Sequence, residues 1–222
     1  MFQTRPVFVF DWDGVLANQD ELHRIAADIF ALAGVPEQTE RATYDRILGA
    51  GGYNFRRQLQ EVLRHHPHLI PSAGTLHRTF TDSLERLSQP VYPDVYQFIQ
   101  RLRDRYRVAL LVAGDSEFEQ QKIQRSGLAS SVSQMLFVPR NREVGAAKAR
   151  ALGQLLELYP SVIYFDDEPE ALAAVHDTHA HHQRVVSFRV DRSQKQTARY
   201  SHAIRSFADP LPPLLERLLT AP

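Results

Sequence analysis

Residues 7–16 read Val7-Phe8-Val9-Phe10-Asp11-Trp12-Asp13-Gly14-Val15-Leu16. The first four are apolar and two of them are β-branched, which is typical of a strand buried inside a parallel sheet. Asp11 and Asp13 fall at the carboxyl end of this strand, the edge where open α/β sheets bind ligands, and Gly14 permits a sharp exit. Two carboxylates this close repel each other, so the stretch predicts a divalent cation beside them. The alternative is an acidic turn that binds nothing.

The composition narrows the class of protein. A chain of 222 residues suits one domain, or a core with a small second domain. Its 26 Lys plus Arg balance 26 Asp plus Glu, so we expect neither a nucleic-acid nor a membrane partner. The absence of cysteine excludes disulfides, thiolate metal sites and cysteine nucleophiles. No apolar run is long enough for a membrane span and no leader pattern opens the chain, so we expect a soluble cytoplasmic protein.

Helical periodicity fills the chain after the first strand. Apolar residues recur at helical spacing from Leu22 to Phe30, and three further helical segments follow up to Leu87. A glycine-rich turn, Gly49-Ala50-Gly51-Gly52, separates two of these helices. No strand pattern occurs between Leu16 and Pro90, so residues 17–90 are predicted to form an all-helical insert.

From residue 91 onward, strand and helix patterns alternate. Short apolar runs predict strands at residues 108–112, 135–138, 162–165 and 185–188. Helices are predicted between them, at residues 94–106, 117–126, 146–158 and 171–175, and again near the end of the chain after residue 211. This alternation predicts an α/β protein with a parallel sheet covered by helices on both faces.

A second pair of acids follows a second buried strand. Asp166 and Asp167 come directly after Val162-Ile163-Tyr164-Phe165. Because the carboxyl ends of parallel strands meet at one edge, these acids are expected to converge with Asp11 and Asp13. Such oxygen ligands suit Mg²⁺. Lys148, at the start of the preceding helix, adds a cation suited to a phosphate or an ionised nucleophile.

These motifs resemble those of a known family. Asp11-x-Asp13-Gly14-Val15-Leu16, the helical insert, Lys148 and Phe165-Asp166-Asp167 follow the order of the haloacid dehalogenase-like (HAD) phosphohydrolase superfamily. The likeness covers about residues 7–188 and points to the subgroup with an α-helical cap, similar to phosphoglycolate phosphatase and β-phosphoglucomutase. It implies a Rossmann-like core (residues 1–16 and 91–222) and a small helical cap (residues 17–90).

The resemblance also implies roles. Asp11 is expected to attack phosphorus and form an aspartyl-phosphate, while Asp13 protonates the leaving oxygen and then activates water. Mg²⁺ is expected to bind Asp11, the backbone carbonyl of Asp13 and Asp167, with Asp166 close by. Lys148 is expected to bridge the nucleophile and the phosphoryl oxygens. A neighbouring carboxylate is expected to help Asp13 hold its proton. The presence of Asp13 favours phosphate chemistry over dehalogenation, because the dehalogenating relatives lack this second acid.

One motif departs from the family pattern. The family expects Ser or Thr at the end of the second core strand, whereas this chain has Ala113, followed by Gly114-Asp115-Ser116. The backbone N–H groups of Gly114 and Asp115, or the Ser116 hydroxyl, are the expected replacements, although the Asp115 carboxylate is unfavourable beside a phosphate.

Other residues are weaker candidates. Gly51, Gly52 and Arg56 (or Arg57) are expected to contact substrate from the cap, with a flexible linker and solvated arginines as the alternative. The histidines at positions 176, 179, 181 and 182, and those at 65, 66 and 68, are expected to be solvated rather than metal-binding. Trp12 is expected to be core. Arg140 and Arg142 are expected in a solvated turn, with an approach to an acidic substrate as the alternative. Asn18 and Gln19 are expected at the mouth of the pocket.

The sequence thus favours an Mg²⁺-dependent phosphatase acting on a small phosphorylated metabolite. A sugar-phosphate mutase using the same acids is one alternative. A catalytically weak relative with a binding or regulatory role is the other, motivated by Ala113 and Asp115.

Overall fold

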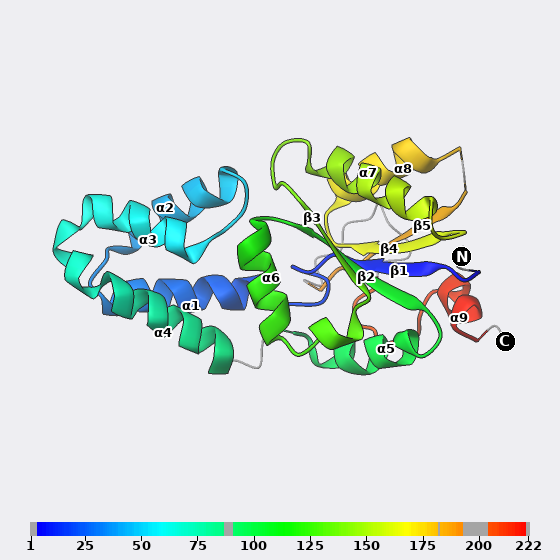
Figure 1. The fold of residues 1–222 in the computed structure, drawn as a ribbon, viewed down its shortest axis with the longest axis horizontal. Helices are drawn as coiled ribbons and strands as arrows, with labels where there is room; N and C mark the ends of the chain where they lie inside the picture. Colours follow the sequence, from blue (N-terminus) through cyan, green and yellow to red (C-terminus); the bar gives the residue numbers. More distant parts are fainter. Residues whose placement is uncertain (1–3, 87–90, 182, 193–203, 221–222) are drawn as a thin grey trace.

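A computed structural model describes residues 4–86, 91–181, 183–192 and 204–220 (Figure 1). Its strands form one parallel sheet in the order β3-β2-β1-β4-β5. The strands are β1 (Val7–Phe10), β2 (Arg107–Ala113), β3 (Gln134–Val138), β4 (Val162–Asp166) and β5 (Val185–Arg189). The strand predicted from residues 7–10 is therefore the central one, fully buried as its unbroken apolar run requires.

The register of the sheet brings the two acid pairs together. Phe10 at the end of β1 pairs with Phe165 on β4, and the Asp11 N–H donates to the Phe165 carbonyl over 2.9 Å. Asp11 and Asp166 therefore leave adjacent strands at the same level. The predicted convergence is therefore seen for Asp11, Asp166 and Asp167, but not for the Asp13 carboxylate.

Helices cover both faces of the sheet (Figure 1). Because side chains alternate along each strand, Phe8 and Phe10 pack into one apolar cluster while Val7 and Val9 pack into another. The first cluster is covered by α5 (Pro93–Arg103), α6 (Ser116–Arg125) and α9 (Pro213–Thr220), and the turn η2 (Ala129–Ser131) adjoins it. The second is covered by α7 (Val144–Leu156) and α8 (Pro169–His179). This is the predicted Rossmann-like arrangement.

The helical cap lies between β1 and α5 in the chain and beside one end of the sheet in space (Figure 1). It consists of α1 (Gln19–Leu32), α2 (Glu37–Gly49), α3 (Phe55–His65), η1 (Pro67–Ser72) and α4 (Ala73–Arg86). The side chains of Asn18 and Asn54 cap α1 and α3 by accepting hydrogen bonds from backbone N–H groups of the first turn. The cap has its own apolar cluster, and Phe118 of core helix α6 inserts into it. Cap and core are thus joined by packing as well as by the chain.

The structure adds detail to some expectations and does not reach others. Helix α8 extends to His179 rather than ending near Val175. The predicted boundary between cap and core, at residues 90 and 91, stays a prediction because residues 87–90, which include Leu87, lie outside the described part of the chain. His182 and residues 193–203 also lie outside it. Within the described residues, no helix combines the length and apolarity needed to cross a membrane.

Candidate active site at the carboxyl edge of the sheet

Three carboxylates gather where β1 and β4 end. Oxygen atoms of Asp11, Asp166 and Asp167 lie within 4.8 Å of one another, close enough to share one metal ion. Asp11 and Asp166 are buried and Asp167 is half-buried. The Asp13 carboxylate is not in this group. The expected contribution of Asp13 to metal binding is through its backbone carbonyl, and that contribution stays a prediction.

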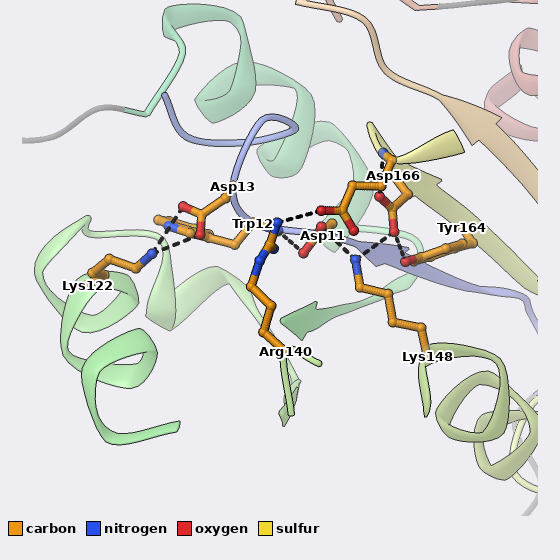
Figure 2. A network of polar contacts seen from close by, with 9 residues as sticks. Asp11, Trp12, Asp13, Lys122, Arg140, Lys148, Tyr164 and Asp166 are labelled. Atoms are coloured by element: carbon orange, nitrogen blue, oxygen red, sulfur yellow. Dashed lines mark hydrogen bonds and ion pairs between the residues drawn. The ribbon is translucent and has the colours of Figure 1, made fainter. Parts of the chain in front are cut away.

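Lys148 holds two of these acids. Its ammonium, on the first turns of α7, lies 2.8 Å from Asp11 Oδ2 and 2.8 Å from Asp166 Oδ2 (Figure 2). Asp166 is fixed further by the Tyr164 hydroxyl and by the Glu168 N–H, which donates to Oδ1 over 2.9 Å. Lys148 therefore lies beside the candidate nucleophile Asp11, at the position predicted from the sequence.

The electrostatics of the cluster indicate an excess of negative charge. Burial raises the pKa of Asp11 to about 7 even though Lys148 opposes the shift, and Asp166 adds to it. Burial, followed by the charges of Asp11 and Asp166, raises the pKa of Asp167 to about 8. Burial alone would lower the pKa of Lys148, but Asp11 and Asp166 raise it. Since crowded, buried carboxylates favour a bound cation, an oxygen-ligated divalent ion such as Mg²⁺ fits these residues.

Gly14 leaves room for this cluster. Its φ of +76° belongs to the region that glycine adopts without strain, and an added Cβ would lie 2.2 Å from Asp167 Oδ2. The turn after β1 is therefore restricted to glycine both by its backbone conformation and by its contact with Asp167.

Asp13 faces a lysine that the sequence analysis missed. Lys122 of α6 places its ammonium 3.0 Å from both oxygens of Asp13 and 2.6 Å from Glu119 Oε2. The neighbour of Asp13 is thus an ammonium, not the carboxylate expected from sequence. Burial raises the pKa of Glu119 to about 8, against the effect of Lys122. For Lys122, burial is outweighed by Asp13 and Glu119, which raise its pKa.

The end of β2 differs from its expected role. The Gly114 N–H donates to the Val138 carbonyl over 3.0 Å, so the prediction that it is available to a phosphate is wrong. Asp115 caps α6 by accepting the Phe118 N–H over 3.1 Å, and its other oxygen lies 3.0 Å from Arg57. A cavity between cap and core, here called the acidic cavity, is lined on its core side by Asp13, Ala113, Glu119, Lys122 and Arg140. Ser116 is exposed on the first turn of α6 and is not among the described residues that line this cavity.

Arg140 lies in the site, whereas the sequence analysis expected it in a solvated turn. It lines the cavity together with Asp13, Ala113 and Lys122, and its Nη2 donates to Glu168 Oε1 over 2.6 Å. Figure 2 shows its guanidinium between the Asp13 and Asp11 sides of the site. Arg142 is exposed, as expected.

The cap supplies the opposite wall of the cavity, through Gln19, which was predicted at the mouth of the pocket, and through residues that were not predicted. The described cap residues on it are Gln19, Leu22, His23, Tyr44, Leu48 and Tyr53. His23 stacks on Tyr44 with 3.8 Å between ring centroids. Arg56 instead lines a separate groove between α3, α4 and α6. Asn18 lines a third groove beside Asp167, and Gln19 borders both that groove and the acidic cavity.

The predicted glycine loop meets the core but does not line this cavity. Gly52 approaches the core so closely that an added Cβ would lie 2.6 Å from the Gly114 Cα and 2.8 Å from the Asp115 nitrogen. Gly51 has open space around it. The loop therefore acts, in this structure, as a contact between cap and core.

The remaining candidates take structural positions. Trp12 is buried in the core, as predicted. His179 is also buried rather than solvated, and its Nε2–H donates to the Ala149 carbonyl over 2.9 Å. Among the residues that the structure describes, no metal-binding group includes a histidine.

Comparison with known proteins places this geometry in a family. A model of the haloacid dehalogenase-like hydrolases matches residues 6–180. No curated protein sequence matches the chain.

Solved structures share the fold at low sequence identity. A haloacid dehalogenase-like hydrolase from Burkholderia xenovorans is 23% identical with a TM-score of 0.65, over 85% of this chain and 83% of that one. A 2-haloacid dehalogenase from Pseudomonas syringae is 17% identical with a TM-score of 0.62, over 97% and 98% of the two chains. A β-phosphoglucomutase-like protein from Thermotoga maritima is 17% identical with a TM-score of 0.58, over 87% and 88%. With the family model matched over most of its length, the chain belongs to the haloacid dehalogenase-like hydrolases.

Proposed function

We propose that this hydrolase is an Mg²⁺-dependent phosphatase that cleaves a small phosphorylated metabolite through an aspartyl-phosphate. The observation that carries the proposal is the group of Asp11, Asp166, Asp167 and Lys148 at the sheet edge. Asp13, two residues after Asp11, supplies a second acid, which lines the cavity between cap and core together with Lys122 and Arg140. An ionised carboxylate needs no activating base to act as a nucleophile, so Asp11 requires only positioning and charge screening.

The proposed reaction uses these side chains in two steps. Asp11 attacks phosphorus, the bond from phosphorus to the leaving oxygen breaks, and Asp13 gives that oxygen a proton. Asp13 then takes a proton from water as the water attacks the aspartyl-phosphate, which releases inorganic phosphate and restores Asp11. Lys148, held between Asp11 and Asp166, keeps the nucleophile aligned and offsets negative charge on the phosphoryl oxygens.

The metal would be held by Asp11, Asp167 and the backbone carbonyl of Asp13, with Asp166 close by. When bound, Mg²⁺ screens the repulsion between the Asp11 carboxylate and the phosphate. Tyr164 and the Glu168 N–H orient Asp166 beside this group.

A phosphomutase acting on a sugar phosphate is the second candidate. The cap lies tightly on the core through Gly52 and through the Arg57–Asp115 ion pair of 3.0 Å. Such closure excludes water, and a mutase must protect its aspartyl-phosphate from water.

Phosphate release from a panel of monoesters, with and without Mg²⁺, tests the proposal. The panel includes p-nitrophenyl phosphate, sugar phosphates and phosphorylated carboxylic acids. We expect Mg²⁺-dependent release by the intact protein and its loss in Asp11→Asn, with Asp20→Asn, an exposed acid nearby, as the matched control. Conversion of a sugar phosphate to its isomer without net phosphate release identifies the mutase.

Two results contradict the proposal. Absence of turnover across the whole panel favours the binding or regulatory role. Release of chloride from 2-chloropropionate in place of phosphate turnover identifies a dehalogenase.

A further inference from the structure

The phosphate side of the site lacks the groups that the sequence led us to expect. Ala113 carries no hydroxyl, and the Gly114 N–H is bonded to the Val138 carbonyl. Gly52 of the cap lies against the Asp115 nitrogen. A phosphoryl group that reaches Asp11 therefore needs further hydrogen-bond donors.

Three cations border Asp11 and Asp13, and they differ in how many acids they already contact. Lys148 lies within 2.8 Å of both Asp11 and Asp166. Lys122 contacts both oxygens of Asp13 at 3.0 Å and Glu119 at 2.6 Å. Arg140 contacts a single carboxylate oxygen, on Glu168, through Nη2. Among the described residues, Arg140 alone of these three keeps most of its donors uncommitted.

The strand register places Arg140 near Ala113, where the expected hydroxyl group is missing. Ala113 at the end of β2 pairs with Val138 at the end of β3, and Arg140 follows Val138 by two residues. Its guanidinium lies between the Asp13 and Asp11 sides of the site (Figure 2). The charges of both Asp11 and Asp13 act on Arg140, which is consistent with this position.

We propose that Arg140 binds the oxygens of the transferring phosphoryl group and replaces the hydroxyl that Ala113 lacks. The inference rests on the proposed phosphate chemistry. A guanidinium offers a planar set of N–H donors that matches two phosphate oxygens, so one arginine supplies more than a serine hydroxyl can. Glu168 holds the guanidinium at one edge through Nη2 and leaves Nε and Nη1 for the ligand.

Binding of inorganic phosphate in the presence of Mg²⁺, measured by calorimetry, tests this role without requiring turnover. We expect Arg140→Gln to raise the dissociation constant roughly ten- to a hundredfold, the range for loss of charged hydrogen bonds. Arg142→Gln, an exposed arginine of the same loop, is the matched control and is expected to bind as the intact protein does.

Two further variants separate phosphate binding from a structural ion pair. Glu168→Gln removes the charge that Arg140 pairs with but leaves the guanidinium and an acceptor oxygen, so it should lower phosphate affinity much less than Arg140→Gln does. Ala113→Ser restores a hydroxyl, so Ala113→Ser/Arg140→Gln should recover part of the affinity lost in Arg140→Gln.

The outcomes distinguish this inference from the proposed function. Unchanged phosphate affinity in Arg140→Gln, or equal losses in Arg140→Gln and Glu168→Gln, overturns the role of Arg140 even if the protein hydrolyses monoesters. Failure of the intact protein to bind phosphate overturns it too. Arg140-dependent binding without hydrolysis of any monoester supports the role of Arg140 and contradicts the phosphatase.

Discussion

At the scale of single residues, Lys122 balances the acids on the cap side of the site. It is largely buried and lies between Asp13 and Glu119, and Glu119 is itself almost fully buried. Removing the ammonium would leave two carboxylates facing each other in a poorly solvated place, which is far less favourable than the ion pairs. Lys122 therefore supports both the position of Asp13 and the stability of the core.

Lys122→Met should lower the free energy of unfolding above about pH 8, where Glu119 is ionised, by about 3–5 kcal/mol, the usual cost of breaking a buried pair on one side. Urea unfolding measures this change. Glu119→Gln/Lys122→Met removes one of the stranded carboxylates and should be more stable than Lys122→Met alone. Equal stabilities of the two variants would show that the Glu119 charge is not balanced by Lys122.

At the scale of elements, the loop between α2 and α3 determines how closely the cap approaches the core. Gly51 and Gly52 both have positive φ, at +127° and +111°, but only Gly52 touches the core backbone. The pair therefore separates the effect of backbone strain from that of contact.

Gly52→Ala should push the cap loop away from Gly114, because the new methyl group meets backbone atoms that cannot rotate aside. Hydrogen–deuterium exchange at residues 113–118 should become faster than in the intact protein. Gly51→Ala carries a comparable backbone strain but meets open space, so exchange there should stay close to that of the intact protein. Equal effects of the two substitutions contradict a specific contact.

The cap wall also predicts a preference among leaving groups. Its described residues include tyrosines, leucines, His23 and Gln19, but no lysine or arginine. We expect a higher kcat/KM for monoesters with a neutral, partly apolar alcohol than for esters whose leaving group carries a carboxylate. The reverse order across size-matched substrates would show that the substrate does not rest on this wall.

The elements also show which parts of the site could be predicted from the sequence. Asp11 and Asp166 end buried apolar runs, and parallel strands must bring such ends together, so their meeting was predictable. Asp13 and Lys122 lie 109 positions apart and meet only because α6 passes under the cap. Arg140 follows β3 in a loop whose direction no local pattern specifies. Contacts that depend on how helices and loops pack left no signal in the spacing of residues.

At the scale of the whole molecule, the end of the chain closes the core. Phe207 stacks on Phe98 of α5 with 4.4 Å between ring centroids. Asp94, at the start of α5, accepts hydrogen bonds from Arg192 Nη1 over 2.8 Å, from Ser206 Oγ over 2.7 Å and from the Phe207 N–H. One carboxylate thus joins the segment after β5 to the rest of the core.

Asp94 should make stability depend on pH in the acid range. Burial alone would raise its pKa, but the bonds from Arg192 and Ser206 outweigh burial, and the pKa lies below the ordinary value of 3.8. The stabilisation is therefore fully present above about pH 4 and is lost as pH falls through the lowered pKa. We expect Asp94→Asn to lower the free energy of unfolding by about 1–3 kcal/mol at pH 7, with the difference shrinking below pH 4.

Urea unfolding across this pH range measures the difference. Asp209→Asn, an exposed acid of the same segment, is the control and should change little. A difference for Asp94→Asn that stays constant down to pH 3 contradicts the linkage.

The central claim, that Asp11 carries the phosphoryl group during turnover, can be tested by trapping the intermediate. The protein is quenched during turnover of a monoester with Mg²⁺ and treated with borohydride, which reduces an acyl phosphate. Peptide mass spectrometry should then find homoserine in place of Asp11, dependent on substrate and absent without it. Turnover with Asp11 unmodified, or with reduction at another carboxylate, would contradict the account.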